Sequence, residues 1–398
     1  MDITIYPTVL RGNITAIPSK SQAHRLLICS AFANKETELV CPETNLDIEA
    51  TASCLRALGA EITRKNGSYF ICPIRSVPKS TVLPCGESGS TLRFLLPIVG
   101  ALGVDGLFEL EGRLSDRPLS PLWELMERQG CQLSRPTKST VRCQGKLSCG
   151  TYSIDGGISS QFITGLLFAL SLMEGQSQIQ IKGKLESKPY VDMTLQAMSL
   201  FDVHLQSLTC NEKQRYLSPG TITVDGDWSN GAFFLAATAI GNAVVVDGLN
   251  PHSKQGDKEI SNILANINNT STVDASNIPD LIPILSVVAA QNKGCTFTNI
   301  QRLRLKESDR VAAVIAMLAS LNVKAIADDS TLTVYPGVFA GGVVNSFSDH
   351  RIAMAAAIAA TKATDPVTIL NAHCVAKSYP RFWEEYVKLG GHYEQYIR

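Results

Sequence analysis

Two kinds of helical segment alternate along the chain, and this alternation limits the possible folds more than any other feature. One kind is apolar on nearly all sides and occurs six times, at residues 21–34, 90–102, 160–173, 230–240, 280–291 and 350–361. Such helices must be buried on every side. The other kind is amphipathic and runs into a turn and a strand, at residues 48–62, 121–133, 191–205, 257–267, 311–326 and 381–393. The sequence therefore predicts six repeated helix-and-strand units.

The length of the chain indicates how these units are grouped into domains. With 398 residues, the chain is long enough for two domains, so six units predict three in each. Glycines support the repeat, because Gly59, Gly130 and Gly390 lie where the amphipathic helices end and a left-handed C-cap is favoured. Strand-like segments such as 220–226 and 331–337 fill the gaps. We expect an α/β fold.

Composition excludes several classes of protein. Because 36 basic residues balance 36 acidic ones, a whole-chain cationic field for nucleic acid is excluded, although a local cationic site is not. Eleven cysteines without a CxxC pair, and six scattered histidines, match neither a disulfide framework nor a metal site. The N-terminus lacks a signal region, and the apolar stretches fall short of the ~18 residues that suggest a membrane span. We expect a cytosolic protein with reduced thiols.

Polar residues that open the apolar helices point to function. They are Ser19, Ser88, Ser159, Asp227, Asp280 and Asp349. Each could simply cap its helix, which is worth ~1 kcal/mol. Capping does not explain Lys20, Arg93 and Arg351, which lie in or beside first turns, where the helix dipole disfavours positive charge. Exposed N–H groups, hydroxyls and unpaired cations predict a receptor for phosphate and carboxylate groups. Solvated surface ion pairs remain the alternative for the basic residues.

Ten short segments carry a resemblance to a known family. They are PSKSQAHR at 18–25, GESGSTLRF at 86–94, DRP at 116–118, SSQF at 159–162, SKPYVD at 187–192, QGD at 255–257, IPD at 278–280, LRLKESDR at 303–310, DHR at 349–351 and AKSYP at 376–380. In type and order they are similar to motifs of the 5-enolpyruvylshikimate-3-phosphate (EPSP) synthase family. Each segment alone would be weak evidence, but ten in order over the whole chain are specific.

The resemblance implies a particular architecture. The family has two similar domains, each of three βαβαββ-type units around buried parallel helices, an inside-out α/β barrel with the active site in the interdomain cleft. It places an N-terminal domain at 15–225 and a C-terminal domain at 1–14 and 226–398, with one first strand at about 1–14. It also implies a cytoplasmic monomer without nucleic-acid or membrane partners.

The resemblance further implies a reaction. The enolpyruvyl group of phosphoenolpyruvate would pass to the 5-hydroxyl of shikimate 3-phosphate by addition and elimination, with release of phosphate. This step belongs to the shikimate pathway to chorismate and the aromatic amino acids. No metal or organic cofactor is required.

Site residues follow from the matched motifs. The resemblance makes Asp280 the base for the hydroxyl and Glu307 the group that exchanges protons with the methylene carbon, while Lys20 shares acid–base duty. The implied ligands of shikimate 3-phosphate are Lys20, Ser21, Arg25, Ser159, Ser160, Gln161, Ser187, Asp280 and Lys306. The implied ligands of phosphoenolpyruvate are Lys20, Gly89, Arg117, Gln161, Arg310, Arg351 and Lys377. Tyr190 would support the shikimate ring by packing.

Two positions depart from the family pattern. Glu87 stands where Asn is frequent, and Arg302 stands where some members carry Asn. Because Gly89 is present, we predict a site open to the phosphoenolpyruvate mimic glyphosate. Two rivals remain: an enolpyruvyl transferase acting on UDP-N-acetylglucosamine, disfavoured because 113–117 contains no cysteine, and a non-catalytic anion-binding protein.

Overall fold

The computed structural model describes residues 1–396, and the chain divides into two compact units. The N-terminal unit is Pro18–Asp225; the C-terminal unit combines Met1–Ile17 with the chain from Gly226 onward. Each unit has its own hydrophobic core, and the two sets of buried core residues do not overlap. None of the helices in the described part of the chain combines the length and apolar character needed to cross a membrane.

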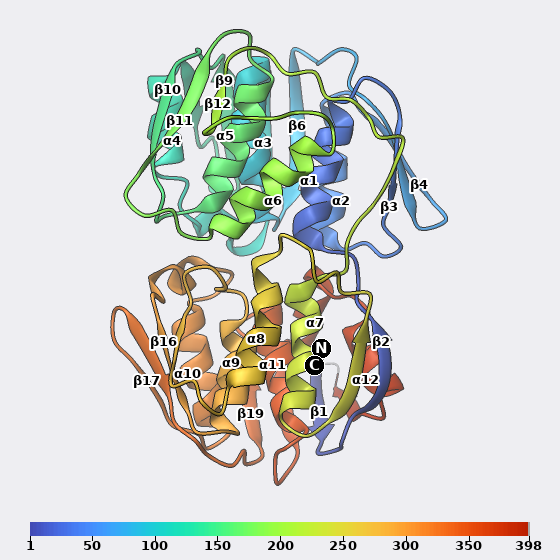
Figure 1. Cartoon of the computed structure of the whole chain (residues 1–398), viewed down its shortest axis with the longest axis vertical. Helices are drawn as coiled ribbons and strands as arrows, with labels where there is room; N and C mark the ends of the chain where they lie inside the picture. Colours follow the sequence, from blue (N-terminus) through green and yellow to red (C-terminus); the bar gives the residue numbers. More distant parts are fainter. Residues whose placement is uncertain (397–398) are drawn as a thin grey trace. The chain divides into compact units, whose positions relative to one another are not determined.

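The N-terminal unit contains both predicted kinds of helix (Figure 1). The apolar helices are α1 (Lys20–Ala31), α3 (Gly89–Leu102) and α5 (Ser160–Ser171), and the amphipathic ones are α2 (Leu46–Ala57), α4 (Leu122–Arg128) and α6 (Lys188–Ser199). The 3-10 helix η1 (Gly112–Asp116) follows β7. The strands are β3 (Thr37–Val40), β4 (Glu61–Lys65), β5 (Ser68–Cys72), β6 (Ser80–Gly86), β7 (Asp105–Leu110), β8 (Cys131–Ser134), β9 (Thr140–Gly145), β10 (Thr151–Asp155), β11 (Ser177–Lys182), β12 (Thr209–Cys210) and β13 (Thr221–Thr223).

The sheets of this unit share one pattern. Their strand orders are β13-β3-β5-β4, β6-β7-β9-β8 and β10-β11-β12. In the second sheet β6 runs parallel to β7, a helix crosses between them, and β8 and β9 form an antiparallel hairpin beside β7. A parallel pair needs such a helical crossover, whereas a hairpin needs only a short turn. This is a βαβαββ arrangement.

The C-terminal unit is built from the same parts (Figure 1). Its apolar helices are α7 (Trp228–Ala239), α9 (Ile282–Ala290) and α11 (His350–Ala360), and its amphipathic helices are α8 (Ile260–Asn266), α10 (Arg310–Ser320) and α12 (Phe382–Lys388). The 3-10 helices are η2 (Gly256–Glu259), η3 (Gln301–Leu305) and η4 (Ala372–Lys377). The strands are β1 (Asp2–Tyr6), β2 (Arg11–Thr15), β14 (Ala243–Asp247), β15 (Thr272–Asp274), β16 (Cys295–Thr298), β17 (Ala325–Ala327), β18 (Thr331–Val334), β19 (Gly342–Asn345), β20 (Val367–Leu370) and β21 (His392–Tyr396).

Two sheets of the C-terminal unit repeat the pattern, and the third has only a parallel pair of strands. Their orders are β15-β16-β18-β17, β19-β20-β1-β21 and β14-β2. The single first strand expected at residues 1–14 is wrong in detail, because β1 lies between β20 and β21 while β2 pairs with β14. Pro7 follows β1 directly, and proline has no N–H to continue a ladder. The chain therefore changes sheets within its first fifteen residues.

The apolar helices form the centre of each unit. Helices α7, α9 and α11 contact one another, and so do α3 and α5. Burial is nearly complete: in α11 every residue from His350 to Ala360 is buried. The predicted positions of the six apolar and six amphipathic helices are confirmed to within a few residues. Gly59 and Gly130 follow their helices with φ of 110° and 105°, which confirms the predicted C-caps.

Candidate active site

The first turns of the apolar helices carry the caps that the sequence indicates. Ser19, Ser88 and Ser159 each accept a hydrogen bond from a backbone N–H of the first turn, and Asp227 and Asp349 do the same. Asp280, for which capping was the alternative to a catalytic role, does not cap its helix. Helix α9 starts only at Ile282, so the Asp280 carboxylate lies outside the first turn and is available for side-chain contacts.

The positive charge of Lys20, the first residue of α1, is balanced by a neighbouring carboxylate. Its Nζ lies 2.9 Å from Oδ2 of Asp47 in α2, and only 14% and 9% of the two side chains are exposed. The expectation of an unpaired cation is therefore wrong here. Asp47 offsets the penalty of placing a positive charge at a helix N-terminus. Sequence reasoning missed Asp47 because its partner is 27 positions away.

Arg117 lies against the start of α3. An ideal Cβ built on Gly89 would lie 2.5 Å from Nη1 of Arg117, so only glycine lets this guanidinium approach the helix. Two residues predicted to bind phosphoenolpyruvate are thus in contact. Glu87, the departure from the family pattern, packs over Gly112 at the start of η1.

Gln161 joins α5 to α3 through its amide. Its Oε1 accepts a hydrogen bond from Nη1 of Arg93 (2.7 Å), and its Nε2 donates to Oγ of Ser90 (2.9 Å). Arg93 also donates from Nη2 to the carbonyl of Pro118 (3.1 Å), the residue after Arg117. Arg93 is therefore placed to hold both Gln161 and the Arg117 segment in position, a role that the motifs did not assign.

Arg25 is almost fully buried, and its guanidinium donates hydrogen bonds to acceptors of the protein itself. It donates from Nε to Oγ1 of Thr194 (2.9 Å), from Nη1 to the carbonyl of Ser21 (2.6 Å) and from Nη2 to the carbonyl of Tyr190 (3.0 Å). Burial lowers the pKa of Arg25 to about 10. These contacts fasten α6 to α1. Binding of a substrate carboxylate by Arg25 stays a prediction.

The three predicted serine ligands occupy helix starts. Ser159 caps α5, Ser160 is the first residue of that helix, and Ser187 precedes α6 with a left-handed φ of 52° and no cap hydrogen bond from its side chain. Ser160 and Ser187 are buried. Both helices therefore present N–H groups beside small hydroxyls, the combination that suits an oxyanion.

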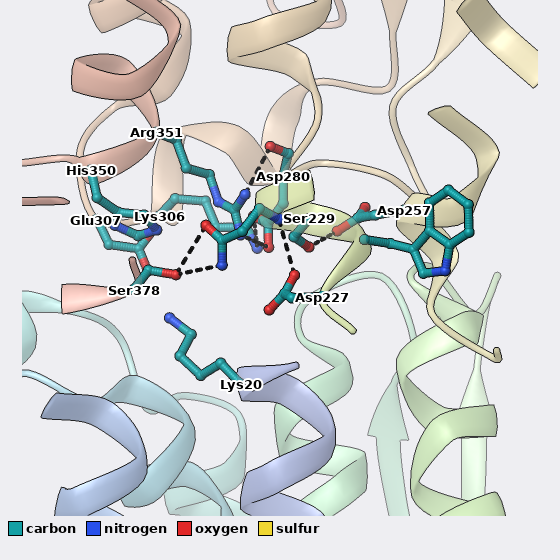
Figure 2. A network of polar contacts seen from close by, with 12 residues as sticks. Lys20, Asp227, Ser229, Asp257, Asp280, Lys306, Glu307, His350, Arg351 and Ser378 are labelled. Carbon is teal, nitrogen blue, oxygen red and sulfur yellow. Dashed lines mark hydrogen bonds and ion pairs between the residues drawn. The ribbon is translucent and has the colours of Figure 1, made fainter. Parts of the chain in front are cut away.

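Asp280 is the centre of the cationic cluster in the C-terminal unit (Figure 2). Its Oδ1 accepts from Nη1 of Arg310 (2.6 Å) and lies 3.4 Å from Nζ of Lys306, and its Oδ2 accepts from Nη2 of Arg351 (3.2 Å). Burial alone would raise the pKa of Asp280, but the charges of Arg351, Lys306 and Arg310 hold it well below its usual range. At neutral pH this group is a carboxylate.

Arg310 connects Asp280 to two further carboxylates. Its side chain is 1% exposed and donates from Nη2 to Oε2 of Glu307 (2.6 Å) and from Nε to Oδ2 of Asp349 (2.9 Å). The expectation of an unpaired cation is wrong for Arg351 as well, because Arg351 pairs with Asp280. Asp349 both caps α11 and accepts from Arg310, which the DHR motif alone did not indicate.

Lys306 completes the cluster. Burial lowers its pKa to about 8, against the opposing charge of Asp280, and Arg310 and Arg302 lower it further. Arg302, the second departure from the family pattern, therefore weakens the proton affinity of Lys306. Lys377 ends η4, and the next residue, Ser378, accepts from Nδ2 of Asn230 in α7 (3.1 Å).

Neither metal ligation nor disulfide chemistry is indicated within residues 1–396. The described side chains contain no group of three His, Cys, Asp or Glu that could hold a metal ion. All eleven cysteines are free thiols. The acidic groups of the cluster, Asp280, Glu307 and Asp349, are held by guanidinium and ammonium groups instead.

Comparison with known proteins places the chain in a family. A model of the family described as EPSP synthase (3-phosphoshikimate 1-carboxyvinyltransferase) matches residues 6–386. The 3-phosphoshikimate 1-carboxyvinyltransferase of Clostridium kluyveri is 36% identical over 99% of this chain and 98% of its own. That of Clostridium acetobutylicum is 38% identical over 98% of this chain and 97% of its own.

Solved structures share the fold. EPSP synthase from Acinetobacter baumannii superimposes with a TM-score of 0.79 at 24% identity, over 99% of this chain and 100% of that one. The enolpyruvyl transferase NikO from Streptomyces tendae gives a TM-score of 0.72 at 16% identity, over 99% and 98%. The expected two-domain α/β fold is thus confirmed. With relatives this similar along their whole length, the chain belongs to the EPSP synthase family.

Proposed function

We propose that this chain transfers the enolpyruvyl group of phosphoenolpyruvate to the 5-hydroxyl of shikimate 3-phosphate and releases phosphate. The observation that carries the proposal is the cluster in which Asp280 and Glu307 share Arg310. Two carboxylates beside buried cations provide what the reaction needs: groups that move protons and charges that stabilise anions. Full-length similarity to relatives named for this activity supports the same reaction.

In the addition step, Asp280 orients and deprotonates the 5-hydroxyl. The hydroxyl oxygen bonds to the enol carbon of phosphoenolpyruvate, and the methylene carbon gains a proton and becomes a methyl group. Asp280 is a weak base while three cations hold it. A substrate anion that contacts Arg310 or Arg351 takes over part of their hydrogen bonding, and this raises the basicity of Asp280 at the moment of reaction.

In the elimination step, the methyl carbon loses a proton, the carbon–carbon double bond re-forms and the bond to phosphate breaks. Glu307 is assigned to the proton exchange at this carbon, with Lys20 as the second candidate. Glu307 lies three residues before Arg310 in sequence and 2.6 Å from it in space, so the same cation that binds an anion also fixes the proton carrier. Proximity of this kind removes much of the entropic barrier.

The remaining assignments concern binding. Ser159, Ser160 and Ser187 would hold the phosphate of shikimate 3-phosphate. The other predicted ligands of this substrate are Lys20, Ser21, Arg25, Gln161, Asp280 and Lys306. The residues that would surround phosphoenolpyruvate are Lys20, Gly89, Arg117, Gln161, Arg310, Arg351 and Lys377. The contact of Arg117 with Gly89 supports this grouping. We also propose that the protein acts as a cytoplasmic monomer and is inhibited by glyphosate in competition with phosphoenolpyruvate.

Phosphate release tests the function directly. Phosphate should appear only when the enzyme, shikimate 3-phosphate and phosphoenolpyruvate are all present, and the product should contain a vinyl ether carbon detectable by NMR. UDP-N-acetylglucosamine should not replace shikimate 3-phosphate. Release with the nucleotide sugar would favour the sister transferase, and no release with either acceptor would favour a non-catalytic anion-binding protein.

A further inference from the structure

The QGD segment, Gln255 to Asp257, has no part in the mechanism described so far, yet it is locked onto the start of α7. Gln255 accepts at Oε1 from the backbone N–H of Trp228 (3.0 Å) and donates from Nε2 to the carbonyl of Gly226 (2.8 Å). Both contacts are made within the C-terminal unit. They leave Asp257, on η2, facing the first turn of α7.

Asp257 is a buried carboxylic acid beside the Asp280 cluster. Asp257 is only 2% exposed, and its Oδ2 accepts a hydrogen bond from the hydroxyl of Ser229, the second residue of α7 (Figure 2). The charged groups that face it come from three other places in the unit: Asp280 before α9, Arg351 on α11 and the cap residue Asp227. On its own element, Lys258 is half-buried and Glu259 is exposed.

This environment gives Asp257 an unusual proton affinity. Burial and the negative charge of Asp280 raise its pKa from 3.8 to about 7, although Arg351 and the Ser229 hydroxyl favour the ionised form. The buried Asp257 and the partly buried Asp280 share the attraction of Arg351 and resist being ionised together. Asp257 therefore carries a proton for part of the time near neutral pH.

We infer that Asp257 is a positioning residue for the anion site around Arg351 and Asp280, and that anion binding there is linked to uptake of a proton by Asp257. An incoming anion draws on the positive charge of Arg351 that otherwise stabilises the ionised Asp257. By reciprocity, the protonated form favours the anion. The inference rests on the proposed function only in taking this anion to be a substrate.

The direction of the pH effect follows from this linkage. Well below pH 7, Asp257 is protonated with or without the anion, so affinity does not depend on its titration. As pH rises through the pKa of Asp257 in the anion-free protein, Asp257 loses its proton. Anion binding must then return a proton to Asp257, so the anion affinity falls. Above the higher pKa of the occupied site, the affinity levels off.

Sulfate is a suitable probe, because its charge does not change between pH 6 and 7.5, a range that lies below the pKa of Lys306, about 8. Calorimetric titration of the full chain with sulfate, in two buffers of different ionisation enthalpy, reports affinity and proton uptake together. A shift of one pKa unit on binding predicts affinity about threefold weaker at pH 7.5 than at pH 6, with about half a proton taken up at pH 7.5.

Three variants make the test specific. Asp257→Asn keeps an acceptor for Ser229 but cannot titrate, so most of the pH dependence and proton uptake should disappear. Only the smaller contribution of Lys306, whose pKa of about 8 lies just above this range, should remain. Ser229→Ala removes a donor that favours the ionised form, so the fall in affinity should move to higher pH; this variant preserves the test if Asp257→Asn does not fold. Glu259→Gln makes the same change of charge at an exposed site on η2 and should behave like the wild type.

A sulfate affinity that does not change with pH in the wild type would overturn the inference. An unchanged pH dependence in Asp257→Asn, or the absence of sulfate binding, would overturn it as well. None of these results depends on turnover. If phosphate release failed while the linkage held, the proposed reaction would be wrong and the anion site would stand. If the reaction held without the linkage, only the role of Asp257 would be wrong.

Discussion

Lys306 is the residue whose ionisation should be most visible in kinetics. Burial lowers its pKa to about 8, and the ammonium group lies 3.4 Å from Asp280. A lysine is charged below its pKa, so binding of shikimate 3-phosphate should weaken as pH rises through about 8. We expect kcat/KM for shikimate 3-phosphate to fall by up to about tenfold per pH unit above this value.

Replacement with arginine provides the check. Lys306→Arg keeps a cation that does not lose its proton in this range, so the alkaline fall should move beyond pH 9.5 even if the absolute rate is lower. Lys324→Arg, on the same unit but stacked on Tyr335 away from the cluster, should keep the wild-type profile. A profile unchanged in Lys306→Arg would assign the titration to another group.

His24 provides a second prediction at this scale, for stability. Its ring is buried, Nδ1 lies 2.7 Å from Oγ1 of Thr51, and burial lowers its pKa from 6.5 to about 3. The unfolded chain binds this proton below pH 6.5 and the folded chain does not, so stability is lost as pH falls from 6.5 toward 3. Between pH 7 and pH 5 the loss should be about 2 kcal/mol.

Urea unfolding at the two pH values measures this loss. His24→Gln removes the titration and should lose about 2 kcal/mol less than the wild type on acidification, whatever its stability at pH 7. His252→Gln, at an exposed histidine, should lose as much as the wild type. Equal losses in His24→Gln and the wild type would show that His24 does not stay neutral in the folded state.

Some site residues can be recognised from short sequence motifs, whereas others are found only through contacts between residues far apart in the sequence. Asp280 and Glu307 could be proposed as site residues because they lie inside short motifs that resemble the family's. Their partners could not: Asp349 reaches Arg310 across 39 positions and Asp47 reaches Lys20 across 27, and no local pattern encodes these pairings. The sequence therefore predicted cations but not their compensation by carboxylates.

At the scale of elements, the contact between the start of α3 and the segment after η1 requires glycine at position 89, because Arg117 occupies the space of a side chain there. In Gly89→Ala the new methyl group would lie 2.5 Å from Nη1 and 3.1 Å from Cζ of Arg117, so the guanidinium must move. Loss of one charge-assisted hydrogen bond costs roughly 1.5–3 kcal/mol, so KM for phosphoenolpyruvate should rise on the order of tenfold to a hundredfold. The value of kcat should change less.

Steady-state kinetics with varied phosphoenolpyruvate measures this effect, and glyphosate inhibition should weaken in parallel. Gly337→Ala is a matched control, because the three atoms nearest to its methyl group would all belong to Val323, at 3.2 Å and beyond. Its KM should stay near the wild-type value. Unchanged KM in Gly89→Ala would mean that Arg117 does not bind phosphoenolpyruvate.

Helix positions were predictable because periodicity is a local property of the chain. The start of α9 was not: Asp280, which could have capped the helix, contacts Arg310, Arg351 and Lys306, and the helix begins at Ile282 instead. Tertiary charge pairing outweighs a cap worth ~1 kcal/mol. The break between β1 and β2 was also missed, although Pro7 marks it.

At the scale of the whole molecule, residues 1–396 contain six helix pairs and their sheets, distributed over two units with separate cores. The repeat count was readable from the sequence, because each unit repeats the same helix types. Strand neighbours were not, because β1 pairs with β20 and β21 more than 350 positions away. The proposed ligands belong to both units, so the full chain is the form in which catalysis has to be tested.

Phosphate release by Glu307→Gln, at saturating concentrations of both substrates, tests the central claim most directly. Loss of one acid–base group should lower kcat by about 10²- to 10⁴-fold, while the affinity for shikimate 3-phosphate changes only a few-fold. Glu384→Gln, at an exposed glutamate paired with Arg381, should keep the wild-type rate. A wild-type rate in Glu307→Gln would contradict the claim that this carboxylate carries the proton.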